Sequence, residues 1–140
     1  MSELTLDQAM KIVEVGFSHG RKTNCLPLGI AVLDPRGHLI SFAREDGTSF
    51  LRPAIAQAKA WGALGMGMGS RALENRPDRF MMTLNSVSGG KTLNAPGGVI
   101  IRDQEGKILG AVGVTGDVSD RDEACAVAGI EAVGLIADTG

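Results

Sequence analysis

Four charged residues have types and positions that suit chemistry on a small carboxylate or carbonyl compound. Arg44 and Asp46 follow an apolar segment and precede a glycine, so we expect both at the end of a strand. Lys59 lies in a stretch made almost entirely of Ala, Gln and Trp, where a lysine can reach a ligand's carboxylate or simply remain in water. Glu123 and its neighbour Asp122 stand where a helix should begin, so capping is the simpler role for both. If the protein is an enzyme, Arg44 and Lys59 would anchor an anion while Asp46 or Glu123 transfers protons.

The two histidines and two cysteines are the other candidate ligands. His19 is expected near the C-terminal end of the first helix, which favours a protonated imidazole, so a surface position is its simpler role and a metal or cofactor ligand the alternative. His38 follows a turn and is expected to be exposed. Cys25 and Cys125 lack the spacing of a zinc site, so we predict two buried thiols in a reducing compartment and no dedicated metal site.

Composition and missing signatures exclude several classes of function. The chain has a net charge of −2, one Trp, four Phe and no Tyr, which argues against a nucleic-acid partner. No apolar stretch approaches the ~20 residues of a membrane span, and the first ten residues do not resemble a signal peptide. There is no GxGxxG after a strand, GxxxxGK[ST], GxSxG, HExxH or EF-hand loop. We therefore expect one cytoplasmic domain over residues 1–140, with no nucleic-acid or membrane partner.

The segment 96–123 organises the rest of the chain. It predicts a β-hairpin whose strands, near 99–102 and 107–115, are joined by the polar turn 103–106. Glycines before and within these strands remove side chains where a helix, a ligand or a neighbouring backbone can approach closely. These glycines are Gly97, Gly98, Gly110, Gly113 and Gly116. Gly97, Gly98 and Gly113 are our candidates for a ligand-binding surface.

The remaining segments predict helices and a second hairpin. Thr5 and Gln8 form a capping box, so a helix should begin near Leu6. In order, we further expect a hairpin over 28–44 with its turn at 34–37, a helix over 54–63 capped by Ser49, a short helix over 70–75, and a last helix over 121–137 capped by Ser119 or Asp120. Residues 80–84 fit a short strand or a helical turn equally well. Hairpins without parallel crossovers indicate an α+β fold, with an antiparallel sheet and helices packed on it.

Several of these segments together carry a family resemblance. They are PGGVIIRDQEGKILGAVGVTGDVSDRDEACAVAG at 96–129, LTLDQAMKIV at 4–13, LGIAVLDPRGHLISFAREDG at 28–47 and AQAKAWGAL at 56–64. With them the chain resembles the GlcG/HbpS family of small haem-binding or "haem-degrading" domains over roughly residues 4–137. The same domain type forms the C-terminal part of PduO-type corrinoid adenosyltransferases.

The resemblance implies a profilin-like α+β fold with a five-stranded antiparallel sheet, in which 80–84 would be the fifth strand. It also implies a small ligand, haem or another tetrapyrrole, held against the glycine-lined strand with His19 as the residue to test. The alternative is an enzyme or accessory protein for a small carboxylate or carbonyl compound of a catabolic pathway.

We also expect a homo-oligomer. Helix faces rich in alanine, such as 54–63 and 124–132, pack closely, but part of that surface can exceed what one sheet covers. Members of the resembling family are commonly oligomers, which implies the same. The segment around Met66 and Met68 is expected near an interface or a pocket.

Overall fold

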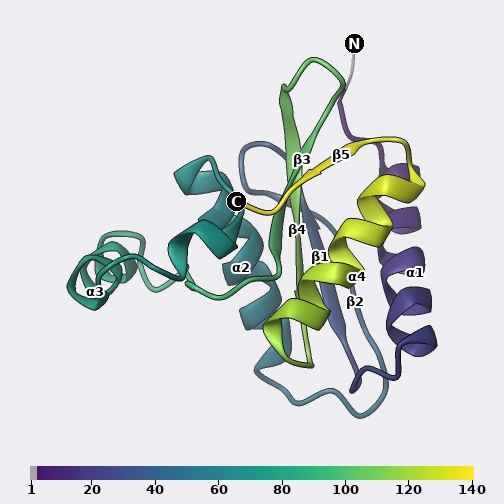
Figure 1. Ribbon diagram of the computed structural model, residues 1–140, viewed down its shortest axis with the longest axis horizontal. Helices are drawn as coiled ribbons and strands as arrows, with labels where there is room; N and C mark the ends of the chain where they lie inside the picture. The colour runs from purple at the N-terminus through teal and green to yellow at the C-terminus, as the bar shows by residue number, and fades with distance from the viewer. Residues whose placement is uncertain (1–2) are drawn as a thin grey trace.

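A five-stranded sheet with helices on both faces forms the body of the protein (Figure 1). The computed structural model describes residues 3–140. Its elements are α1 (Leu6–Lys22), β1 (Gly29–Leu33), β2 (Leu39–Arg44), α2 (Arg52–Met66), the 3-10 helix η1 (Ser70–Leu73), α3 (Asp78–Val87), β3 (Gly98–Arg102), β4 (Ile108–Thr115), α4 (Ser119–Ala132) and β5 (Ile136–Asp138). The strand order is β2-β1-β4-β3-β5 and each neighbouring pair is antiparallel. This confirms the predicted α+β fold with a five-stranded antiparallel sheet.

The two predicted hairpins are present, and their turns share one hydrogen-bonding scheme. Asp34 Oδ1 accepts from the N–H groups of Arg36 and His38, at 2.9 and 3.0 Å. Asp103 Oδ1 accepts in the same way from the residues two and four positions later, at 2.9 Å each. Gly37 and Gly106 close the turns with φ of +87° and +86°, a conformation that glycine adopts without strain. Each hairpin is therefore specified by a local Asp-to-Gly signal.

The fifth strand of the sheet is not the segment that was predicted. Residues 80–84 lie in α3, a helix that begins after Pro77 and buries Met81. The fifth strand is β5, which pairs with β3 through Ile101 and Ala137. The last helix ends at Ala132, before the predicted position 137, because Gly134 (φ +76°) turns the chain back towards the sheet.

The helix starts agree only in part with the predicted caps. At α1 the capping box is complete, with Gln8 N–H donating to Thr5 Oγ1 at 3.1 Å and Thr5 N–H donating to Gln8 Oε1 at 3.0 Å. Ser49 does not cap α2, which begins without a side-chain cap and with proline in its first turn. Ser119 is the first residue of α4 and makes no capping bond, so that prediction was also wrong.

The two faces of the sheet are packed differently. Helices α1 and α4 cover one face with large aliphatic side chains such as Ile12 and Ile130, which pack with Ile30 of β1. Helix α2 covers the other face with small residues such as Ala60 and Ala63. The small residues let the α2 backbone lie almost directly on β4 and β3. Within residues 3–140, no helix is both long enough and apolar enough to cross a membrane.

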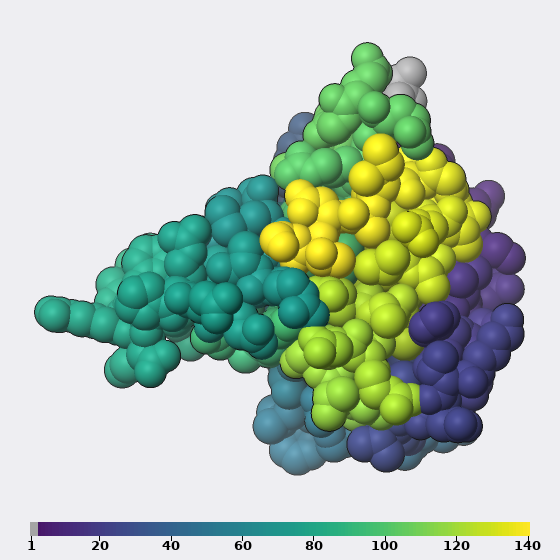
Figure 2. Space-filling model, in the orientation of Figure 1, coloured from purple at the N-terminus to yellow at the C-terminus, as the bar shows by residue number. Residues whose placement is uncertain are grey.

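Helix α3 forms an arm that extends away from the sheet (Figure 2). It buries only Met81 and packs lightly on the rest of the chain. We call α3 and its connections, residues 74–95, the arm.

Candidate functional site

The glycine-lined strand is covered by α2. A β-carbon on Gly113 would lie 1.8 Å from the backbone oxygen of Ala56, and one on Gly98 would lie 2.1 Å from that of Lys59. Gly97 is buried as well, and a β-carbon there would meet Val114 O at 2.7 Å and Lys59 Nζ at 2.9 Å. The sequence left open whether a helix, a ligand or a neighbouring backbone lies close to these glycines. In the structure it is helix α2.

Lys59 and Asp122 form a buried ion pair between α2 and α4. Lys59 Nζ lies 3.2 Å from Asp122 Oδ2 and donates to the Val114 carbonyl at 2.9 Å, with the residues 3% and 1% exposed. Burial lowers the pKa of Lys59 and raises the pKa of Asp122, and in each case the charge of the partner opposes the shift. Asp122 Oδ1 also accepts from Asp117 N–H at 2.9 Å. Lys59 therefore connects two helices past the C-terminal end of β4 and is not open to a dissolved anion.

The other residues suggested for catalysis are held in separate places. Arg44 and Asp46 are exposed and line an open hollow of about 500 Å³ beside Arg21, whose guanidinium pairs with Glu45 at 3.0 Å. Glu123 pairs instead with Arg71, at 2.9 Å.

The hydrogen bond to Glu123, with one to Asp120, raises the pKa of the Arg71 guanidinium. The four residues suggested for catalysis therefore lie in three different places. Arg44 and Asp46 share one hollow, Lys59 is paired with Asp122, and Glu123 is paired with Arg71. This arrangement does not assemble the anion clamp and proton-transfer group that an enzyme would need.

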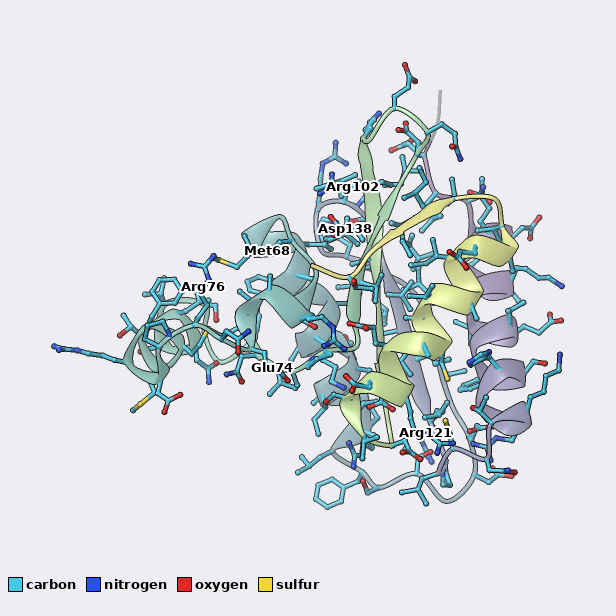
Figure 3. The ribbon with its side chains drawn as sticks, viewed as in Figure 1. Met68, Glu74, Arg76, Arg102, Arg121 and Asp138 are labelled. Atoms are coloured by element: carbon cyan, nitrogen blue, oxygen red, sulfur yellow. The ribbon has the colours of Figure 1, made fainter. Side chains whose placement is uncertain are left out.

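His19 lies in a setting better suited to a ligand. It is half-buried near the end of α1 and lines a hollow of about 300 Å³ with Thr23, Asp120, Arg121 and Ala124. Arg121 crosses from α4 to donate a hydrogen bond to the Thr23 carbonyl, and Figure 3 shows Arg121 at the start of α4. An imidazole and a guanidinium at one hollow can together hold a metal-bearing ligand that carries a negative charge.

His38, in contrast, belongs to a turn and pairs with Asp34 at 3.4 Å, with its side chain 75% exposed. Within residues 3–140, no three His, Cys, Asp or Glu side chains gather into a group that could hold a metal ion.

Sequence reasoning missed two features near this hollow. Asp122 was expected first as a capping residue and second as a chemical group. In the structure it accepts a hydrogen bond from Asp117 N–H and also forms a buried ion pair with Lys59. The sequence did contain a signal for this ion pair. Lys59 is the only charged residue in the predicted helix 54–63, and a buried ammonium requires an anionic partner. The second feature is Arg121, which nothing in the local pattern distinguished from a surface residue.

A family model matches most of the chain, and several solved structures share its fold. A family model described as "Haem degrading protein HbpS-like" matches residues 4–131. A structure of a PduOC–haem complex superposes with a TM-score of 0.87 at 19% identity, covering 96% of this chain and 98% of that one. HbpS superposes with a TM-score of 0.80 at 24% identity, covering 96% and 92% of the two chains.

The Klebsiella pneumoniae protein ORFY superposes with a TM-score of 0.87 at 20% identity, covering 96% and 93%. These likenesses show that the fold is shared. No curated protein sequence matches the chain.

Proposed function

Because the chain belongs to the HbpS-like family of haem-degrading proteins, we propose that it binds haem, with His19 as the protein ligand to the iron. The family match, which extends over residues 4–131, is the observation that carries the proposal. The matching fold of a haem complex supports it. The chain is then a small-ligand-binding domain whose ligand brings its own metal.

The surroundings of His19 support its role. Its imidazole lies at a hollow, while His38 is engaged with Asp34 in a turn. Arg121 at the same hollow can attract a propionate carboxylate of the ligand. The hollow, of about 300 Å³, would hold the part of the ligand that His19 and Arg121 contact. In this arrangement Gly97, Gly98 and Gly113 support the site indirectly, because they allow α2 to pack on the sheet.

A haemin titration tests the proposal. We expect the wild-type protein to shift the Soret band of haemin, and His19→Ala to weaken the binding by about tenfold or more. His38→Ala is the matched control, since it replaces the other histidine of the chain and should bind as the wild type does. If the wild type leaves the Soret band unshifted, haem is not the ligand. If His19→Ala and the wild type give the same titration, the iron is held elsewhere.

We also propose that the protein is a homo-oligomer in which the arm contacts a second copy. Met82 and Val87 on α3 are 73% and 80% exposed although both are apolar. A ten-residue helix is only marginally stable alone in water, so α3 needs a surface to cover it. Met66 and Met68, which precede η1 at the base of the arm, are half-buried in the single chain. We expect them near the same interface.

Light scattering on the purified protein should give a mass that is a multiple of the 14.5 kDa of one chain. Val87→Asp should reduce that mass to one chain, because burying an unpaired carboxylate in the interface is unfavourable. Phe50→Asp, which changes an apolar residue 89% exposed in the loop before α2, should leave the mass unchanged. A wild-type mass of a single chain at micromolar concentration contradicts the oligomer. An assembly that survives Val87→Asp contradicts the role of the arm.

For its location we propose the cytoplasm. Cys25 and Cys125 are both free thiols, which is typical of a reducing compartment.

A further inference from the structure

The two cysteines, far apart in the sequence, lie together in the structure. Cys25 follows α1 and Cys125 lies in α4, with 4% and 0% of each residue exposed. Gly20 leaves the space in which they meet: a β-carbon there would lie 3.6 Å from Cys125 Sγ and 3.7 Å from Cys25 Cβ. Neither thiol has a role in the proposed ligand site. They are the only two cysteines of the chain, so each thiol has the other as its one possible disulfide partner within the chain.

The surroundings of the two sulfur atoms differ. Cys25 Sγ is 3.5 Å from Thr23 Oγ1, and the nearby Cys25 thiol is the main reason that the pKa of the Arg121 guanidinium is raised. Arg21 Nη2 donates to the Cys25 carbonyl at 2.7 Å. Burial, followed by the contact with Cys25, raises the pKa of the Cys125 thiol to about 12. Arg21 and Arg121 therefore place positive charge beside Cys25, while burial keeps the Cys125 thiol protonated.

We propose that Cys25 and Cys125 are a reversible dithiol–disulfide pair that a hydroperoxide oxidises and a thiol reductant restores. Cys25 sulfur attacks one peroxide oxygen and breaks the O–O bond, which yields a sulfenic acid on Cys25 and one water from hydrogen peroxide. Cys125 sulfur then attacks the Cys25 sulfur, forms the S–S bond and displaces the hydroxyl as a second water. The two thiol protons end in the two waters, and the two electrons lost by the thiols reduce the peroxide.

The position of the pair provides a route for the oxidant and a structural consequence. Thr23 and Arg121, which border Cys25, also line the hollow at His19, so a small peroxide in that hollow would be separated from the sulfur by these two side chains. A disulfide would join the segment after α1 to α4. It would close a loop of about 100 residues, a length for which cross-linking markedly restricts the unfolded chain.

Thiol counting and mass spectrometry on the wild-type protein test the pair directly. Before treatment, the denatured protein should contain two reactive thiols. After hydrogen peroxide it should contain none, with a mass lower by two hydrogen atoms and a single-chain band on a non-reducing gel. Dithiothreitol should restore both thiols. Two thiols that survive peroxide, oxygen added to Cys25 or Cys125 in peptide mass spectra, or a disulfide between chains would each overturn the proposal, whereas oxygen added to methionine does not bear on the pair.

Two further measurements separate the pair from unspecific oxidation. Cys125→Ala should stop after the first step, so that its Cys25 adds oxygen and loses no hydrogen pair. Oxidation of the wild type should also raise its unfolding midpoint by roughly 5–15 °C. An oxidised wild type that melts no higher than the reduced protein would contradict the proposed link between α1 and α4. The wild-type measurements decide the outcome even if the variant does not fold, and neither depends on whether haem binds.

Discussion

Gly113→Ala is expected to destabilise the protein by about 3 kcal/mol, because the new methyl group has no space. Its carbon would lie 1.8 Å from Ala56 O and 2.8 Å from Ala56 C, which are backbone atoms that cannot rotate away. Helix α2 would have to move off β4, and the small-residue packing between them would be lost. Denaturant unfolding should show a lower midpoint.

Gly65→Ala is the matched control. Gly65 also belongs to α2, but no atom lies within 4 Å of the position of its β-carbon. Alanine there should leave stability unchanged or raise it by up to about 1 kcal/mol, because it is the better helix former. If Gly113→Ala proves as stable as Gly65→Ala, then α2 does not lie on the strand as closely as described.

Lys59→Met is expected to cost about 3–5 kcal/mol of unfolding free energy. Methionine preserves most of the volume but leaves the carboxylate of Asp122 without its cation, in a residue only 1% exposed. The Val114 carbonyl also loses its donor. The change should appear in chemical denaturation at neutral pH.

The double variant Lys59→Met with Asp122→Asn should recover a large part of that loss, because it removes both charges and keeps an acceptor for Asp117 N–H. Lys11→Met serves as the surface control, since Lys11 is exposed and its pair with Glu14 should contribute at most a few tenths of a kcal/mol. A double variant that is no more stable than Lys59→Met would show that the charge pair is not the source of the effect.

The sequence alone determined the features whose signals are local. The capping box at Thr5 and the two Asp-to-Gly turns are complete within a few residues, so the helix start and both hairpins could be predicted. The alternation of hairpins and helices indicated the α+β class, and the resemblance added the five strands. The position of His19 near the end of a helix was also predicted, and α1 places it there, while its role as a ligand stays a prediction.

Only the tertiary structure decided which residues far apart in the sequence contact one another. Residues 136–138 continue a helical pattern, yet pairing with β3 and the 2.9 Å contact of Arg102 with Asp138 place them in the sheet (Figure 3). Glycines at 97, 98 and 113 predicted a close approach, but the chain's own α2 makes it. Lys59 meets Asp122 across 63 positions, and Cys25 meets Cys125 across a longer separation. Local propensity carries no information about such partners, because the contacts exist only once the helices have packed on the sheet.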